Sequence, residues 1–564
     1  MKKRRIKRRI FVFFFLILIA VAVVLGYKYK DVLMSMFEKE EIAVTNYVAS
    51  SEYTVGLYDL EYNESISLAR GTKVDKFEKE YVKDDKAYEK IKYNDEYYMI
   101  SVENLTDNLD DVVREEEVYV RTSLTLFKDG ESSKILSYIK KGEKLEVLGY
   151  SGLNEDGTVN RYKIKYNDLE GYVYSKYVVR TLEEAKKVYN EKGIQEYMAK
   201  MGDWLGGGNA TTLDYYPYEK PKFENNVMPS EVRALYINGT AVRNIDQYIE
   251  FAKNNNINAF VIDIKDNEAP SYNSPVLQEY SKTNYEHTLN SYDNFKTYVK
   301  KAKDAGIYLI GRITTFKDSY FVNDHPETAI KDTSGKPFSH NGSYWPTAYN
   351  RLVWEFNVEL GKEAITELGF NEIQFDYVRF PDRTTTLEYY GTINLNNAYK
   401  ESKASALQTF LMYACDEIHS VGGYVSVDVF GESASSYVTA YGQFWPALSN
   451  IVDVISGMPY PDHFNAHEYG ISQVVWTVPY TLLTYWGKSV VEKQNIIPTP
   501  AVVRTWIQVY NATKEPYTVY DSTKVNEEIQ ALYDNGLRGG YMTWNGLSSI
   551  DKYYAVSAAF RKEH

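Results

Sequence analysis

The stretch Glu372-Ile-Gln-Phe-Asp-Tyr-Val-Arg-Phe-Pro381 has the pattern of a buried β-strand that ends in polar residues and a proline. Side chains alternate between the two faces of a strand, so Ile373 and Phe375 would point to surrounding helices. Gln374 and Asp376 would then point inward. The stretch therefore predicts an acidic side chain, Asp376, at the carboxyl end of a strand.

On both sides of this stretch, short apolar segments recur along the last 330 or so residues, a length that suits a single barrel. They begin near Val232, Asn258, Ile307, Glu372, Tyr424, Asp453, Ile496 and Gly539. Helical patterns lie between them, for example at 246–255, 352–368 and 404–421. Eight such units predict an α/β fold, a C-terminal (β/α)8 TIM barrel over residues 231–564. The alternative, a doubly wound open sheet, normally has a G-x-G-x-x-G turn, which residues 237–241 lack.

Polar side chains gather at the ends of several predicted strands, where barrel enzymes carry their active sites. Besides Asp376, those expected to face inward or lie at the rim are Asp263, Lys265, Arg312, Lys317, Asp428, Arg504 and Gln508. Buried charges are costly unless they are paired or used. The set indicates either a polar substrate site or, as the alternative, an ion-pair network that closes the barrel.

Aromatic residues accompany these charges. Tyr460 and Trp506 come just after or within predicted strand ends, where a flat ring can stack on the C–H face of a sugar. Most of the other tryptophans are expected in the core. Together with the carboxylates, the two rings predict a carbohydrate ligand.

Four segments carry a resemblance: 307–318, 369–381, 427–431 and 458–464. They resemble an uncharacterised bacterial family of glycoside hydrolases with a (β/α)8 barrel, distantly related to α-amylase-like and α-galactosidase-like enzymes. The resemblance implies that Asp376 is the nucleophile. It leaves the second carboxylate open between Asp428, inside the motif, and Glu432 just beyond it. Asp462 is a weaker candidate, because the family is expected to have serine there.

Glycoside hydrolysis needs a nucleophile or base and an acid with a raised pKa. The hypothesis is Asp376 as nucleophile, Asp428 as acid/base or substrate-fixing group, and Glu432 as the alternative acid. The separation of the two carboxyl groups would decide between retaining and inverting chemistry.

Nearby cations would support these acids. Arg312 and Arg379 are expected to keep Asp376 ionised, since a cation lowers the pKa of a neighbouring carboxylate. Lys317 and His463 are expected to bind sugar hydroxyls at the rim. No metal and no cofactor is predicted.

Three other functions are open. The main alternative is a non-catalytic carbohydrate- or cell-wall-binding surface protein. A metal-dependent deacetylase would use His463 and His467, but no H-E-x-x-H motif is present. A serine hydrolase is disfavoured because Gly431-Glu-Ser-Ala-Ser435 lacks the last glycine of a nucleophile elbow.

The N-terminus predicts a location. Residues 1–9 contain seven Lys or Arg and no acid, and Ile10–Tyr27 is an uncharged run at the lower end of the length that spans a bilayer. Residues 1–30 are therefore predicted as a cytoplasmic basic segment and a transmembrane anchor, with the bulk of the chain extracellular. A cleaved signal peptide is the alternative, because Ala20-Val-Ala22 has small-residue spacing.

Residues 40–180 read as all-β and contain an exact repeat, Lys90-Ile-Lys-Tyr-Asn-Asp95 and Lys163-Ile-Lys-Tyr-Asn-Asp168. The second copy resembles a bacterial SH3-type domain. The predicted domains are a degenerate SH3-like domain at 40–112 and an SH3-like domain at 116–180. Residues 181–230 are predicted as a helical segment and a Gly-rich linker.

Composition narrows the partners. The net charge is −13 and the single cysteine, Cys415, cannot form an internal disulfide. An acidic chain without clustered basic residues outside its first segment is not expected to bind nucleic acid. The expected partners are a polysaccharide or peptidoglycan-type glycan and, through the N-terminal helix, the membrane.

Overall fold

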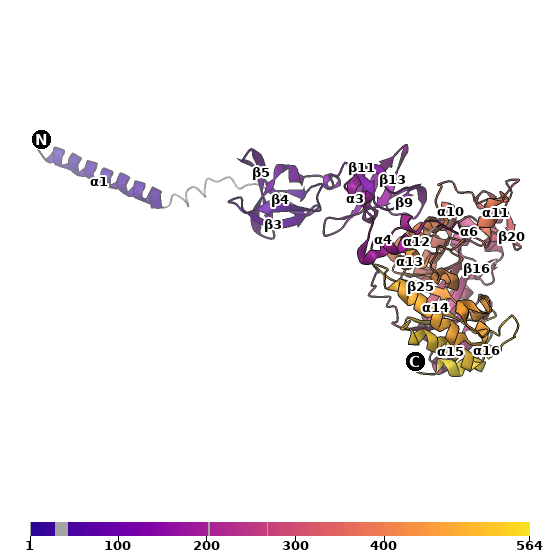
Figure 1. Ribbon diagram of the computed structural model, residues 1–564. Helices are drawn as coiled ribbons and strands as arrows, with labels where there is room; N and C mark the ends of the chain where they lie inside the picture. Colours follow the sequence, from indigo (N-terminus) through magenta and orange to yellow (C-terminus); the bar gives the residue numbers. More distant parts are fainter. Residues whose placement is uncertain (1, 29–42, 201–202, 268) are drawn as a thin grey trace. The chain divides into compact units, whose positions relative to one another are not determined.

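The computed structural model describes residues 2–28, 43–200, 203–267 and 269–564 (Figure 1). The chain forms two compact units, and the second holds Tyr119–Leu145, Leu169–Val173 and Tyr177–His564. The catalytic candidates all lie in this second unit. The predicted domain boundaries stay a prediction.

Helix α1 spans Lys2–Lys28 and runs through the seven cations as well as the apolar run. Among the residues that the structure describes, no helix combines the length and the apolar character needed to cross a bilayer. The transmembrane helix expected at Ile10–Tyr27 is therefore not supported.

Two seven-stranded antiparallel sheets have the same strand order, which confirms that the sequence repeat is a structural repeat. The first is β3 (Glu64–Ala69), β2 (Thr54–Tyr58), β6 (Glu96–Ser101), β5 (Lys86–Tyr93), β4 (Lys73–Lys83), β1 (Ala43–Val48) and β7 (Leu105–Thr106). The second is β10 (Ile135–Ile139), β9 (Leu124–Phe127), β13 (Leu169–Tyr174), β12 (Val159–Tyr166), β11 (Lys144–Leu153), β8 (Glu117–Val120) and β14 (Val178–Val179).

The repeated hexapeptide forms the same hairpin in both sheets. Its Lys-Ile-Lys-Tyr part ends β5 or β12, and its Asn-Asp pair makes the turn into the next strand. Asn94 and Asn167 have φ of 49° and 53°, a left-handed conformation that asparagine tolerates. The assignment of these sheets to the SH3 type stays a prediction.

The Gly-rich segment at residues 206–212, which was expected as part of a linker, packs against the barrel domain. Short helices α3 (Leu182–Lys186) and α4 (Ile194–Met198) precede it. Ile194, Met198 and Tyr215 are buried in a cluster with Val438 and Phe444 of the barrel domain. Apolar residues on either side of the glycines therefore pack against the barrel domain, and the linker within residues 181–230 stays a prediction.

Parallel strands form the barrel in the order in which they occur in the chain. They are β15 (Val232–Ile237), β16 (Ala259–Asp266), β18 (Tyr308–Thr314), β22 (Glu372–Asp376), β24 (Tyr424–Phe430), β25 (Val454–Met458), β26 (Val502–Val503), β27 (Thr505–Gln508) and β28 (Gly540–Trp544). Strands β26 and β27 are one stave interrupted at Arg504: β26 pairs with β25, and β27 pairs with β28. Since β28 also pairs with β15, eight staves make a nearly closed ring.

Helices follow most strands and cover the outside of the barrel (Figure 1). The main ones are α5 (Ile245–Asn254), α8 (Tyr292–Asp304), α10 (Arg351–Glu363), α12 (Lys403–Ser420), α14 (Pro479–Gln494), α15 (Ser522–Asp534) and α16 (Ile550–Phe560). Local chemistry sets where several begin: the side chains of Asn350, Ser402 and Asp521 accept hydrogen bonds from backbone amides in the first turns of α10, α12 and α15.

The inside of the barrel is filled by side chains. The apolar part of this core includes Ala234, Val261, Ile310 and Met542. Gln374 of β22 is fully buried among them and donates to Ser456 and to the sulfur of Met542. The barrel is therefore a packed core, and chemistry is restricted to the residues above it, at the carboxyl ends of the strands.

Candidate active site

Four neighbouring staves end in a group of charged side chains, which we call the mouth cluster: Asp263 and Asp266 of β16, Arg312 of β18, Asp376 of β22 and Asp428 of β24. Strand pairing places them together, because Asp263 is the register partner of Arg312, and Thr314 is the partner of Asp376. Sequence alternation predicted four of the five.

Arg312 is the centre of the cluster. Its Nη1 donates to Asp263 Oδ1 at 2.8 Å and to Asp266 Oδ1 at 3.1 Å. Its Nε and Nη2 both donate to Asp376 Oδ2, at 3.1 and 2.6 Å. One guanidinium therefore serves three carboxylates, which leaves the cluster with excess negative charge.

Asp376 also accepts a hydrogen bond at its other oxygen, from the amide of Tyr377 at 2.6 Å. Tyr377 has a φ of 54°, a costly conformation for a tyrosine, and turns the chain sharply after the strand. The side chain of Asp376 is 9% exposed, whereas that of Asp266 is 44% exposed. The cluster thus lies just beneath the surface, with Asp266 on its open side.

The two acids of β16 differ in protonation. Burial raises the pKa of Asp263 to about 7, against the effect of Arg312. Burial acts in the same direction on Asp266, but Arg312, the amide of Asn267 and the Thr314 hydroxyl together lower its pKa.

Asp428 is buried, and it is the one acid of the mouth cluster that accepts no hydrogen bond from Arg312 in the described structure. Its Oδ1 accepts a hydrogen bond from Trp506 Nε1 at 2.8 Å. Its Oδ2 is buried without a hydrogen-bond partner among the described residues. Burial, and then the nearby Asp376 carboxylate, raise the pKa of Asp428 well above its ordinary value.

Asp376 and Asp428 lie at the same level of neighbouring strands. The last register pair of β22 and β24 is Phe375 with Val427, and the two acids follow directly. Because adjacent strands are about 4.8 Å apart, their carboxyl groups are neighbours across the strand gap. Asp428 is therefore the carboxylate that lies next to Asp376 across this strand gap, and the choice between Asp428 and Glu432 as the second catalytic acid stays a prediction.

Lys265 was expected inside the barrel and is not there. The register of β16 and β18 shifts between Asp263 and Lys265, as in a β-bulge, so alternation is broken at this point. Lys265 Nζ instead binds Asp318 at 2.8 Å, with both side chains buried, and lies over the ring of Phe356 in α10. The bulge brings Asp266 to the mouth in its place, which alternation alone could not reveal.

Arg504 and Gln508 were expected to bind substrate, and the structure uses both internally. Arg504 Nη1 donates to both oxygens of Glu372, at 2.8 and 2.9 Å, and Tyr308 donates to the same carboxylate at 3.0 Å. We call these three residues the base cluster, because Tyr308 and Glu372 begin their strands. Gln508 is fully buried and accepts from the amide of Asp462.

Asp462, the weaker acid candidate, is also occupied within its loop. It is fully buried and accepts hydrogen bonds from Tyr510 and from the amide and hydroxyl of Thr513. These three residues hold together the loops after β25 and β27.

Neither predicted sugar-stacking ring is accessible. Trp506 is 1% and Tyr460 5% exposed. Trp506 instead orients Asp428, and Tyr460 stacks on Trp544 with ring centroids 6.4 Å apart. Trp544, at the end of β28, is half-buried and lies under the guanidinium of Arg312 at 5.5 Å, so it is the ring that borders the mouth.

Arg379 lies elsewhere than expected, whereas Lys317 lies at the rim. Arg379 donates to Asp382 at 3.3 Å and lies over the rings of Tyr377 and Phe430, at 5.0 and 4.5 Å. No contact between Arg379 and Asp376 occurs among the described residues, so Arg312 alone is the cation that binds this acid. Lys317 lies over the ring of Tyr377 at 5.3 Å, at the rim as expected.

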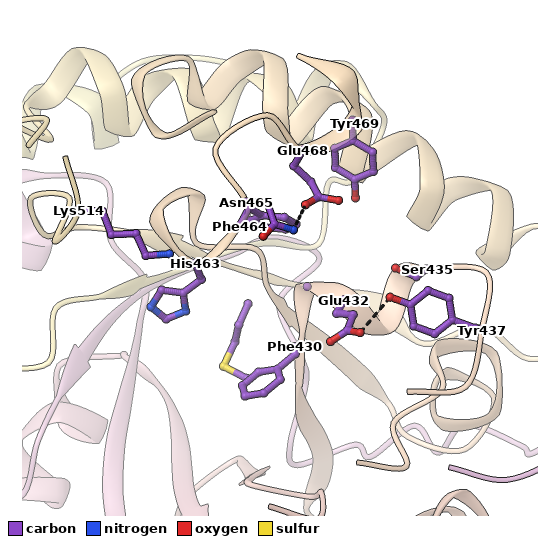
Figure 2. Close-up of a pocket in the computed structure, with 12 residues that line it drawn as sticks. Phe430, Glu432, Ser435, Tyr437, His463, Phe464, Asn465, Glu468, Tyr469 and Lys514 are labelled. Carbon is purple, nitrogen blue, oxygen red and sulfur yellow. Dashed lines mark hydrogen bonds between the residues drawn. The ribbon is translucent and has the colours of Figure 1, made fainter. Parts of the chain in front are cut away.

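Glu432 and His463 line a separate pocket beside the mouth, with a volume of about 580 Å³ (Figure 2). Glu432 accepts hydrogen bonds from Tyr437 and Tyr441, at 2.9 and 2.7 Å. The side chain of His463 is 61% exposed. The described part of the chain holds no group of three or more His, Cys, Asp or Glu that could bind a metal ion.

Solved structures to which this chain is similar include the glycoside hydrolase domain of PgaB (BpsB) from Bordetella bronchiseptica. It is 12% identical, covers 59% of this chain and 98% of that chain, and has a TM-score of 0.43. A class V chitinase from Pseudomonas fluorescens Pf-5 is 12% identical, with 58% and 98% covered and a TM-score of 0.37. A hypothetical protein from Ruminiclostridium thermocellum ATCC 27405 is 31% identical, with 35% and 97% covered and a TM-score of 0.29. None of these likenesses bears on function at such TM-scores.

No curated protein matches the chain. Residues 234–549, more than half of the 564-residue sequence, match the family described as "Putative glycosyl hydrolase domain". The match begins and ends within the barrel and contains the whole mouth cluster. This protein therefore belongs to that family and is classed with the glycoside hydrolases.

Proposed function

We propose that the mouth cluster hydrolyses a glycosidic bond of a polysaccharide, with Asp376 as the nucleophile and Asp428 as the acid. One observation carries the assignment: two carboxyl groups at the same level of neighbouring strands have opposite environments. Asp376 accepts hydrogen bonds from a guanidinium and an amide, donors that suit a carboxylate. Asp428 has a raised pKa and a buried oxygen without a partner in the described structure.

The chemistry follows from this difference. Asp428 protonates the leaving oxygen as the glycosidic bond breaks, and Asp376 bonds to the anomeric carbon. The deprotonated Asp428 then takes a proton from water, which attacks the same carbon and frees Asp376. Arg312 holds Asp376 in place throughout, and Trp506 orients Asp428.

The strand register also supports an outcome for the stereochemistry. Carboxyl groups on adjacent strands, about 4.8 Å apart at the backbone, match the separation of about 5–5.5 Å of retaining enzymes. Inverting enzymes need about 6.5–9.5 Å, to fit a water molecule between acid and sugar. We therefore propose retention of configuration.

The test is hydrolysis of a panel of dye-linked neutral and wall polysaccharides by the full chain and by Asp376→Asn. Wild type should release sugars whose first anomer, followed by proton NMR, matches the substrate, and Asp376→Asn should be inactive. Asp246→Asn, an exposed acid on α5 paired with Lys301, is the matched control and should keep full activity. Activity of Asp376→Asn at the wild-type level would refute the nucleophile, and binding without cleavage by wild type would favour a carbohydrate-binding barrel.

We further propose that the chain is exported and that its two β modules bind wall glycan or act as a spacer. The support is the order of charge in residues 1–27 and the repeat of the modules. Brief protease treatment of intact cells should remove the barrel domain from an expressed, C-terminally tagged chain. Full protection of the tag, with cleavage only after lysis, would contradict export.

A further inference from the structure

The pocket beside the mouth is built from the segments that follow β24 and β25. Phe430 and Met458, the last residues of these strands, line it together with Glu432 and Phe464. Figure 2 shows Phe430, Glu432 and Phe464 among the side chains around the pocket. Its volume of about 580 Å³ lies within the range of small-molecule sites, roughly 300–1,000 Å³. Neither Asp376 nor Asp428 lines it, so the pocket is distinct from the mouth cluster.

Packed contacts connect the pocket to the mouth. The guanidinium of Arg379 lies over Tyr377, next to Asp376, and also over Phe430. Phe430 in turn contacts Tyr441, which donates to Glu432. Phe430 follows Asp428 by two residues on the same strand, a distance of about 7 Å at the usual rise per residue. The pocket therefore begins about one sugar unit away from the proposed acid.

Its polar groups offer both acceptors and donors for hydroxyl groups. Glu432 is fixed by two tyrosine hydroxyls, one on each carboxylate oxygen, and Glu468 accepts from Asn465 at 2.9 Å. Lys514 reaches the pocket from the loop after β27 and provides an ammonium donor (Figure 2). Each carboxylate oxygen has a further lone pair, so the fixed acids can still accept from a ligand.

An aromatic ring borders the same pocket and is held in place. Tyr469 is 39% exposed and stacks on Tyr485, with centroids 5.8 Å apart and planes at 12°. Its φ of 56° is a left-handed conformation that costs a tyrosine free energy. A fixed ring beside hydroxyl-binding groups is the combination that suits a pyranose.

The charges select among sugars. Glu432 and Glu468 are carboxylates, and Lys514 is a single cation, so the lining carries net negative charge when His463 is neutral. Partial burial, the largest effect, and Lys514 lower the pKa of His463 against the opposing effect of Asp462, which favours its neutral form. A uronic acid would therefore meet repulsion from two acids, whereas an uncharged sugar would not.

We propose that this pocket binds an uncharged sugar unit of the chain whose neighbouring unit occupies the mouth. The inference rests on the proposed function, and it makes the substrate an oligosaccharide or polysaccharide of neutral units that runs across the ends of β22, β24 and β25. Glu432 is then a substrate-binding residue and not the catalytic acid.

Binding is measured by calorimetry in an Asp428→Asn background of the full chain. The raised pKa of Asp428 means that a neutral amide replaces a largely neutral acid, so this background should fold. The probes are maltotetraose, cellotetraose, chitotetraose and tetragalacturonate. The added substitution Glu432→Ala should lower the affinity for the bound neutral tetrasaccharide by about tenfold, as expected for the loss of a hydrogen bond to a charged group. Added Glu250→Ala, an exposed acid on α5, is the matched control and should change nothing.

Added Glu432→Gln keeps the shape of the side chain and removes its charge. It should strengthen tetragalacturonate binding relative to the neutral probe. Wild-type affinity in the Glu432→Ala variant, or tighter binding of tetragalacturonate than of every neutral probe, would overturn the inference. So would the absence of binding by every neutral tetrasaccharide. The proposed function is judged separately, by hydrolysis with wild type and Asp376→Asn, and can hold when the pocket inference fails.

Discussion

The barrel contains two buried clusters of arginine and acid, and they are built differently. In the base cluster, one arginine, Arg504, faces one acid, Glu372, and both side chains are fully buried. In the mouth cluster, Arg312 serves three acids, and Asp428 lies nearby with one oxygen left without a partner in the described structure. In the base cluster the two charges balance. In the mouth cluster negative charge is in excess, close to the protein surface. An ion pair that only stabilises the fold can be replaced by apolar residues of similar size, whereas the acids of a catalytic site cannot be replaced without loss of activity.

The largest expected effect tests the base cluster. Arg504→Met should lower the free energy of unfolding by about 3–5 kcal/mol, because Glu372 is left as a buried, uncompensated charge. The double variant Arg504→Met/Glu372→Met should recover most of the loss, since apolar residues of similar size replace a buried pair well. Urea unfolding followed by tryptophan fluorescence measures both. A double variant as unstable as the single one would mean that the base cluster does more than balance its own charge.

The mouth cluster should respond in the opposite way. Asp428→Asn should reduce kcat by about 10²–10⁴-fold, the usual contribution of a general acid, without loss of stability. Activity of wild type should fall as pH rises through the raised pKa of Asp428, because the proton to be donated is lost. The variant should lack this alkaline decline. Rates on one substrate across pH, together with the thermal midpoint, measure the effect, and an unchanged pH profile would remove Asp428 as the acid.

Sequence alternation was sufficient where strands are regular and failed where they are not. It correctly placed Asp376 and Asp428, because β22 and β24 keep a period of two up to their ends. It misplaced Lys265, because a local irregularity in β16 depends on the neighbouring strand and has no marker in the sequence.

Level and exposure were also beyond the sequence. Arg504 faces inward as expected, but its partner Glu372 lies at the start of β22, so the pair is far below the mouth. Trp506 and Tyr460 have the composition of a sugar platform, yet tertiary packing buries both. Alternation along a strand predicts which face of the sheet a side chain is on. It does not predict the position of that side chain along the barrel axis or how deeply tertiary packing buries it. The pocket beside the mouth depends on three separate loops and could not be foreseen.

A smaller effect concerns the pH dependence of stability. The pKa of Asp263 is about 7 in the folded protein, against 3.8 for the ordinary group, because burial and the neighbouring Asp266 carboxylate outweigh the lowering effects of Arg312 and Tyr236. The folded state thus holds a proton that the unfolded chain has released, so the free energy of unfolding falls as pH rises from about 4 to about 7. Asp263→Asn should flatten this decline relative to wild type, in urea midpoints measured from pH 4 to 8. Equal slopes in the two proteins would show that Asp263 is ionised throughout.

The smallest expected effect concerns Trp544, the ring at the mouth. Trp544→Ala removes a half-buried surface beside Arg312 on which a sugar can stack, an interaction worth about 1 kcal/mol for aromatic contacts. KM should therefore rise about fivefold. The value of kcat should change little, because the ring forms no hydrogen bond with Asp376 or Asp428 in the described part of the chain. Tyr554→Ala, an exposed ring on the outer helix α16, is the control and should leave both constants unchanged. A fall in kcat without a change in KM would instead mean that Trp544 acts through the neighbouring Trp506, which holds Asp428 and contacts Trp544 at 5.6 Å. A change in KM alone would thus show that Trp544 binds sugar, whereas a change in kcat alone would show that it positions the acids of the mouth cluster.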